Sequence, residues 1–182
     1  MFRKLFGRGS ALHDAHAIYG QVVTRARDER LFATFGVPDT FDGRFEMLVL
    51  HLFLIHHRLK GEGERSREVS QCVFDSFIDD MDAALREAAV GDQAVPKRIN
   101  KMTRVFYGRT GAFEEAMASS DSEAALATMM ARNIHPDDEA APDQRPLARY
   151  LLAEAALLEA TSSEAIIKQA DVFTTDWTQR SA

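Results

Sequence analysis

The sequence of residues 41–60, FDGRFEMLVLHLFLIHHRLK, decides the fold class. Apolar side chains cover nearly every side of a helix drawn through this segment. A helix of that kind must be buried among other helices. We therefore predict that the segment forms the central helix of a bundle. Its regular core positions, at alternating spacings of four and three residues, are Phe41, Phe45, Leu48, Leu52, Ile55 and Leu59.

Helical spacing also dominates on both sides of the central segment, and no stretch alternates like a strand. The helix that begins near residue 95 is expected to kink or break at residues 107–111, where two glycines occur. The pattern predicts an all-α fold, an irregular bundle of about six or seven helices with a buried central helix. The other predicted helices cover residues 11–35, 64–90, 121–133, 146–159 and 163–173, with a loop over residues 135–145.

Glycines and short polar side chains predict where these helices begin and end. Gly36 is expected to end the first helix, and Asp39 or Thr40 can cap the central one. Gly91 is expected to follow the end of the third helix, and Asp92 can cap the next.

The N-terminal residues 1–10, MFRKLFGRGS, are basic and aromatic and predict a flexible tail. Residues 11–182 are then expected to form a single helical domain. No apolar run approaches the roughly 20 residues that cross a membrane, and no secretory signal is present. The single cysteine, Cys72, favours a reducing compartment. Together these features predict a cytoplasmic protein of a bacterium.

The formal net charge of −6 is unevenly distributed. Residues 1–109 hold 17 Lys and Arg against 15 Asp and Glu, whereas residues 110–182 hold 5 against 13. Such asymmetry can orient a protein toward a charged partner. A solvated acidic region without any charged partner would produce the same uneven charge distribution.

The most acidic segment lies within the predicted helix 64–90. Asp75, Asp79 and Asp82 share one face there, and Arg86 follows Asp82 at a spacing that allows an ion pair. A wall of aspartates can also hold Mg²⁺ in a small metal-dependent enzyme acting on phosphorylated or isoprenoid substrates. The sequence offers no clear second acidic wall and no nucleophile or nucleotide-binding motif. We therefore favour a solvated, salt-bridged face over an active site.

The predicted helix from residue 95 is basic, and no acidic residue occurs between Asp92 and Glu114. Cations without nearby acids attract the phosphates of RNA or of lipid headgroups. They also serve as the ordinary polar surface of a bundle, and the sequence leaves both interpretations open. The candidate partner-binding residues are Lys97, Arg98, Lys101, Arg104, Tyr107 and Arg109, together with Asp75, Asp79, Asp82 and Arg86 on the preceding helix.

His51 lies amid apolar residues in the central helix. We expect a core histidine that is hydrogen-bonded to a neighbouring helix. Were it functional, an aspartate of the helix 64–90 would be its natural partner.

Three stretches in order resemble the ubiquinol–cytochrome c chaperone family. They are FGVPDTFDGRFEMLVLH at residues 35–51, FDSFIDDMDAALR at residues 74–86, and VGDQAVPKR at residues 90–98 followed by FYGR at residues 106–109. The resemblance extends over about residues 12–175. One departure is Ala89, where the family pattern has glycine. The family motif positions are occupied here by Asp39, Arg44, His51, Asp75, Asp82, Arg86, Asp92, Tyr107 and Arg109.

The resemblance implies a non-catalytic protein, with no cofactor and no metal, that binds newly made cytochrome b and promotes assembly of ubiquinol–cytochrome c reductase. Mitochondrial members bind the ribosome near the nascent-chain exit together with a small partner protein. A ribosome and a small partner subunit are therefore expected partners, and DNA is not. The expected location is the cytoplasmic face of a bacterial inner membrane. Asp39, Arg44, His51 and Asp92 are expected to have structural roles.

A third interpretation remains open beside the chaperone and the enzyme. The basic N-terminal tail and the basic helix could make the chain a membrane-peripheral binding module.

Overall fold

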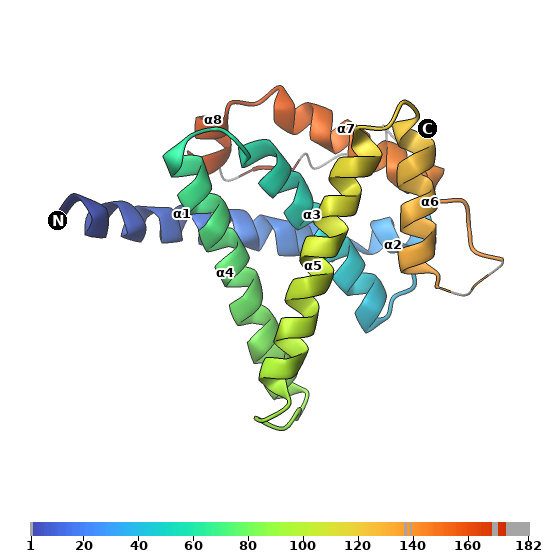
Figure 1. The fold of residues 1–182 in the computed structure, drawn as a ribbon, viewed down its shortest axis with the longest axis horizontal. Helices are drawn as coiled ribbons and strands as arrows, with labels where there is room; N and C mark the ends of the chain where they lie inside the picture. The colour runs from blue at the N-terminus through green and yellow to red at the C-terminus, as the bar shows by residue number, and fades with distance from the viewer. Residues whose placement is uncertain (1, 137, 139, 169–170, 174–182) are drawn as a thin grey trace.

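The computed structural model describes residues 2–136, 138, 140–168 and 171–173, and side chains from residue 9 onward. Within these residues the chain forms eight α-helices and no strand, which confirms the predicted all-α fold (Figure 1). The helices are α1 Phe2–Ala26, α2 Glu29–Phe35, α3 Phe41–Leu59, α4 Glu64–Glu87, α5 Val95–Met117, α6 Ser122–Ile134, α7 Arg145–Glu159 and α8 Ser163–Lys168.

The central position of α3 is confirmed. This helix packs against α1, α4, α5, α6 and α7. Full burial of one large apolar side chain contributes roughly 1.5–3 kcal/mol, so α3 supplies much of the stability of the bundle. Its enclosed apolar side chains are Met47, Leu48, Val49, Leu50, Leu52, Phe53, Leu54, Ile55 and Leu59. Of the predicted core positions, Phe45 is only half-buried, and Phe41 at the start of the helix is 61% exposed.

Several of the predicted helix limits are wrong. The last helix, expected over residues 163–173, ends at Lys168, and residues 171–173 are not helical. The helix expected over residues 11–35 begins at Phe2 and is divided into α1 and α2. The division occurs because Asp28 has extended backbone and its side chain accepts a hydrogen bond from the Arg30 N–H, which caps α2. The expected kink at residues 107–111 is absent, because α5 runs unbroken to Met117. Phe106 and Phe113, on either side of the glycines, are both buried and hold the helix against the core.

The end of α2 and the beginning of α3 follow the predicted capping chemistry. The Thr40 side chain accepts a hydrogen bond from the Gly43 N–H at 3.2 Å. Gly43 itself has no room for a side chain, since a Cβ there would overlap the carbonyl oxygen of Pro38. Gly36 ends α2 in the left-handed conformation that glycine favours.

The prediction that Asp92 caps α5 is wrong. The residue before α5 is Ala94, which makes no side-chain cap. The Asp92 carboxylate instead accepts a hydrogen bond from Arg86 at 2.8 Å. Arg86 also pairs with Asp82 at 2.5 Å, so this arginine joins the end of α4 to the loop that leads into α5.

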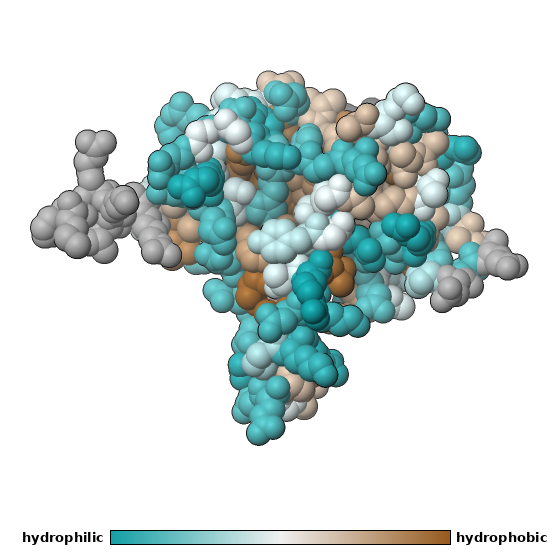
Figure 2. Space-filling model, in the orientation of Figure 1, coloured by the Kyte–Doolittle hydropathy of each residue, from teal (hydrophilic) through white to brown (hydrophobic). Residues whose placement is uncertain are grey.

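The end of α4 and the beginning of α5 project from the body as a helical hairpin (Figure 1). The projecting part is mostly hydrophilic, and apolar surface shows on both sides of its base (Figure 2). Concave surfaces lie at this base and are described below. No helix within the described residues has the length and hydropathy needed to cross a membrane.

Candidate functional site

The first concave surface, which we call the α3/α5 groove, lies between the start of α3, the first half of α5 and the C-terminal end of α6. Its volume is about 750 Å³. Clefts of this size are typical of ligand sites and peptide anchors. Its apolar lining is formed by Phe41, Phe45, Leu85, Met102, Val105 and Ile134.

Phe41 adds an exposed aromatic side chain to the α3/α5 groove. It is one of three large hydrophobic side chains that are exposed in the described part of the chain. It occupies the first helical turn, where only one side of the helix is covered by neighbours. An apolar patch rimmed by polar residues is characteristic of an interaction site.

Four cations line the α3/α5 groove, and one of them is neutralised within the fold. Arg109 on α5 donates three hydrogen bonds to the Glu46 carboxylate on α3, two from Nε and one from Nη2, at 2.9–3.1 Å. Arg98, Lys101 and Arg132 form no ion pair with any residue that the structure describes. The groove therefore combines an apolar floor with a rim on which cations outnumber free carboxylates.

The predicted basic helix exists, but its cations do not share one surface. Arg98, Lys101 and Arg109 line the α3/α5 groove, whereas Lys97 and Arg104 are exposed elsewhere on α5. Tyr107 lines a different cavity. Sequence spacing located the charged helix, but it could not identify α3 and α6 as the other walls of the groove.

The acidic stripe of α4 does not converge with other acids. Asp79 is exposed, and the exposed Asp75 accepts a hydrogen bond from Gln71 at 2.8 Å. The hydrogen bond from Arg86 holds the pKa of Asp82 below its usual range. Across the described residues, no three His, Cys, Asp or Glu side chains are placed to hold a metal ion together. Among the described residues there is thus no second acidic wall of the kind that the enzyme interpretation requires.

His51 is a core histidine, as predicted. Its Nδ1–H donates to the Met47 carbonyl at 2.7 Å, so Nε2 accepts the hydrogen bond from the Tyr150 hydroxyl at 2.8 Å. Burial lowers the pKa of His51 to about 4, which keeps the ring neutral. The partner of His51 is therefore Tyr150 on α7. The expectation that an aspartate of α4 would be its partner is wrong.

Asp39 and Arg44, two further motif residues, form an exposed ion pair at 2.5 Å at the start of α3. The hydrogen bond from Arg44 lowers the pKa of Asp39. This pair joins the residue after Pro38 to the first turn of α3, and the structural role expected for both residues stays a prediction.

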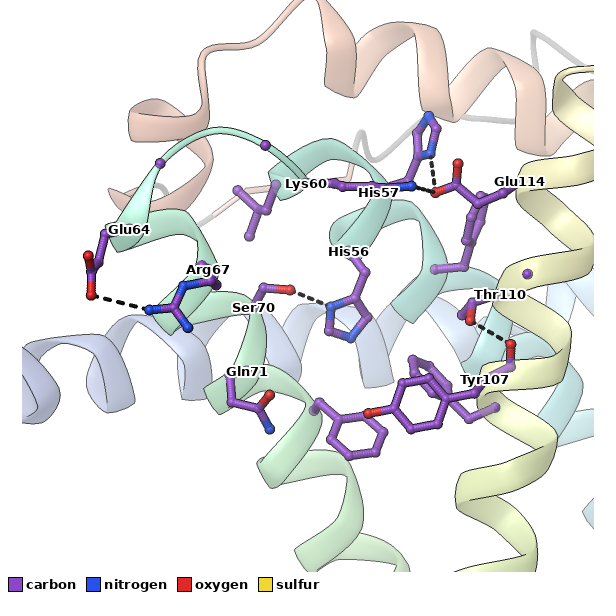
Figure 3. A pocket seen from close by; sticks show the side chains of 17 residues that line it. His56, His57, Lys60, Glu64, Arg67, Ser70, Gln71, Tyr107, Thr110 and Glu114 are labelled. Carbon is purple, nitrogen blue, oxygen red and sulfur yellow. Dashed lines mark hydrogen bonds and ion pairs between the residues drawn. The ribbon is translucent and has the colours of Figure 1, made fainter.

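The second concave surface, which we call the His56 pocket, was not predicted from the sequence. It has a volume of about 870 Å³ and lies between the end of α3, the start of α4 and the middle of α5 (Figure 3). The available signal was a second histidine in an otherwise apolar helix, followed closely by Gly61 and Gly63. This signal could not reveal the pocket, because the other walls are formed by residues 64–74 and 106–114, and spacing does not show that these segments face His56.

His56 is the polar group at the centre of this pocket. Its Nδ1 lies 2.5 Å from the Ser70 hydroxyl. Its ring lies edge-on to Phe106, with centroids 5.5 Å apart, and Phe74 and Tyr107 complete the aromatic wall. Burial lowers the pKa of His56 to about 4, so this ring is also neutral at physiological pH.

The rim of the His56 pocket carries charges that pair with one another. Glu114 accepts hydrogen bonds from His57 at 3.0 Å and pairs with Lys60 at 3.3 Å. Burial opposes ionisation of Glu114, but these two partners lower its pKa below the usual range. Arg67 pairs with Glu64 at 3.2 Å across the first turn of α4.

The fold and its two concave surfaces define a class of protein: a helical bundle that offers apolar recesses to other molecules. Residues 33–173 match the family model described as "Ubiquinol-cytochrome C chaperone". The chain therefore belongs to the ubiquinol–cytochrome c chaperone family, whose members are assembly chaperones of ubiquinol–cytochrome c reductase, and the resemblance noted in the sequence is confirmed.

Curated relatives agree with the family. The chain is 26% identical over 110 residues to ubiquinol–cytochrome c reductase complex assembly factor 1 of Mus musculus, a match that covers 60% of this chain and 37% of that protein. The Xenopus laevis protein of the same name is 23% identical over 117 residues, covering 64% and 58% respectively. The chain thus matches only part of the length of these relatives.

A solved structure is similar over nearly the whole chain. It is the crystal structure of the Cbp3 homolog from Brucella abortus, with 41% sequence identity, a TM-score of 0.84 and 99% of each chain covered.

Proposed function

We propose that the protein is a non-catalytic chaperone that binds newly made cytochrome b in the α3/α5 groove and promotes its assembly into ubiquinol–cytochrome c reductase. Membership of the assembly-chaperone family supports the general role. The observation that carries the site is the exposed Phe41 beside three cations without ion pairs among the described residues. A membrane protein that is not yet assembled presents apolar segments with polar ends, which such a groove suits.

The acidic stripe is a second candidate contact for the same client. Loops on the cytoplasmic side of membrane proteins are rich in Lys and Arg. Asp75 and Asp79 are exposed on α4, where such loops can reach them. The client would then lie along the hairpin, with apolar segments in the groove and basic loops on α4.

The proposal also includes three further partners: the membrane surface, the ribosome and a small partner subunit. A client that inserts into the membrane as it is synthesised would bring the chaperone to the cytoplasmic face of a bacterial inner membrane. Lys97 and Arg104, which are exposed away from the groove, are the residues available for ribosomal RNA or anionic lipid. A small partner subunit could cover the remaining apolar surface at the base of the hairpin.

Site-specific photocrosslinking in the native host tests the groove. A photoreactive phenylalanine analogue at Phe41 should crosslink to cytochrome b. The same analogue at Leu12, an exposed apolar position on α1, should not. Crosslinks from Leu12 alone would contradict the assignment of the groove.

Charge reversal on one helix provides a matched comparison. Arg98→Glu with Lys101→Glu should abolish the crosslink from position 41, because both side chains line the groove. Lys97→Glu with Arg104→Glu introduces the same charge change on α5 outside the groove and should preserve it. Deletion of the gene should deplete the reductase and its cytochrome b, and normal levels of both would refute the chaperone role.

A further inference from the structure

The rim of the α3/α5 groove carries more positive charge than the groove itself neutralises. Among the described residues, three of its cations have no ion-pair partner, and these are Arg98, Lys101 and Arg132. The carboxylate of Glu46 is already held by Arg109 at 2.9 Å. Asp42 is then the one lining carboxylate without a cation partner in that part of the chain. Three cations against one carboxylate make the rim complementary to a surface that carries negative charge.

The cations and the apolar floor follow the same line along α5. The residues of this helix that line the groove are Arg98, Lys101, Met102, Val105 and Arg109. Their spacings of three and four place them on one face of the helix. The stretch from residue 98 to residue 109 is about 16 Å long at the rise of an α-helix. The groove therefore offers an elongated apolar floor with cations along its edge.

The backbone of an occupant would have to be satisfied within the occupant itself. An extended segment would bury its N–H and C=O groups against Phe41, Phe45 and Met102, which offer no hydrogen bonds. An α-helix pairs these groups internally, and about three helical turns match the length of the groove. Amphipathic helices dock in apolar grooves in this way, anchored by side chains spaced three and four residues apart.

We propose that the α3/α5 groove binds an acidic amphipathic α-helix. Its apolar side chains would pack on Phe41 and Phe45, and its flanking carboxylates would pair with Arg98, Lys101 and Arg132. The inference rests on the proposed function, since the helix would be a segment of the client. It adds the backbone form and the sign of charge that the groove selects. A basic helix with the same apolar face would meet like charges along the rim.

Three synthetic peptides of about 14 residues, long enough to span the groove as a helix, test the sign of the charge. They share one stripe of Leu and Phe and have blocked ends. Only the flanking positions differ, and these are all Glu, all Gln or all Lys. Fluorescence anisotropy with the natural protein at low salt should show the Glu peptide binding tightest and the Lys peptide weakest.

The Glu peptide should bind roughly tenfold more tightly than the Lys peptide. This is the factor expected when two or three exposed ion pairs replace like-charge contacts. Raising the salt concentration should reduce the preference, because exposed charges are screened. A preference that is independent of salt would contradict recognition by the rim.

Charge reversal on α5 tests whether the rim sets this preference. Arg98→Glu with Lys101→Glu should make the Lys peptide the tightest of the three, because both side chains line the groove. Lys97→Glu with Arg104→Glu makes the same charge change on the same helix outside the groove and should preserve the original order. All four side chains are exposed, so neither variant disturbs the core.

The floor and the helical form are tested separately. Phe41→Ala should weaken all three peptides several-fold and keep their order, since it removes apolar contact area and no charge. Leu12→Ala, at another exposed apolar position, should leave the three affinities unchanged. A Glu peptide with a central proline should bind at least tenfold more weakly, because proline breaks a helix.

Four results would overturn the proposal: no measurable binding of the Glu peptide, equal affinities for the three peptides, tightest binding of the Lys peptide, or full binding of the proline peptide. If a variant fails to fold, the peptide series and its salt dependence in the natural protein decide the matter. A crosslink from Phe41 to cytochrome b without any preference for acidic helices would remove this inference and leave the proposed function standing. A clear preference without that crosslink would support the acidic helix and assign it to a protein other than cytochrome b.

Discussion

Ala89 occupies a backbone position that favours glycine. Its φ of 57° is the one positive φ of a non-glycine residue in the described chain. It stands just after α4 in a Schellman motif, in which the Val90 N–H donates to the Leu85 carbonyl at 3.1 Å and the Ala89 N–H donates to the Arg86 carbonyl at 3.0 Å. The left-handed conformation costs an L-residue roughly 1–2 kcal/mol, which agrees with the glycine that the family resemblance led us to expect at this position.

Ala89→Gly should therefore stabilise the protein by about 1 kcal/mol, even though glycine gains freedom in the unfolded chain. Urea unfolding of the purified variant would measure the change. Ala88→Gly is the matched control, because Ala88 has a negative φ of −74° and glycine there has no strain to relieve. A lower midpoint for Ala89→Gly would show that the strain at this residue has been misjudged.

At the scale of helices, Arg58 joins the end of α3 to the end of α7. Its Nε donates to the Leu158 carbonyl at 2.9 Å, and its Nη2 donates to the Thr161 carbonyl at 2.7 Å. The last carbonyls of a helix have no partners of their own, and a cation there also suits the helix dipole. The guanidinium is buried and pairs with Glu62 at 3.2 Å.

Arg58→Met should destabilise the protein by about 2–3 kcal/mol, because it keeps much of the apolar stem but removes the charged hydrogen bonds to the Leu158 and Thr161 carbonyls in a buried place. Chemical denaturation followed by circular dichroism would measure the loss. Arg44→Met on the same helix removes an arginine from an exposed ion pair and should change the stability little. Equal effects of the two substitutions would exclude a special role for Arg58.

At the scale of the whole molecule, the features that the sequence predicted correctly depend on residues close to one another in the chain. The segment 41–60 is apolar on nearly every side, and the cap at Thr40 involves a residue three positions away. The break at Asp28 was missed because the apolar spacing continues across it. The continuity of α5 past Gly108 was missed because tertiary packing overrides the low helix propensity of glycine.

The candidate sites depended on contacts between distant residues, which spacing does not reveal. Tyr150 is 99 positions from His51, and Arg109 is 63 from Glu46. The charges on α5 were visible in the sequence, but their division between the groove and the open surface follows from how α3 and α6 pack. The His56 pocket is formed where three helices meet, and it was not predicted from the sequence.

The stability of the molecule should fall in mild acid. The pKa values of His51 and His56 are lowered to about 4 in the folded protein, against an ordinary value of 6.5. The unfolded chain therefore binds more protons between pH 6.5 and pH 4, and each histidine can contribute a slope of about 1.4 kcal/mol per pH unit in that window. Above pH 6.5 these two residues contribute no pH dependence.

Unfolding free energies measured in urea at pH 7 and pH 5 would detect this loss. His56→Phe should reduce the difference between the two pH values, since one of the two contributions is removed. The same difference in the variant and the natural protein would mean that His56 is as easily protonated in the fold as in the unfolded chain.

The packing of α1 against α4 sets the order in which the molecule can be completed during translation. The buried face of α1, with Ala11, Ala15, Ile18 and Val22, leaves the ribosome before α4, which is its main neighbour. The segments that become α2 and α3 emerge in between, so this face stays without that cover until the end of α4 has been synthesised. For that interval the nascent chain of an assembly chaperone itself exposes the kind of apolar surface that other chaperones recognise.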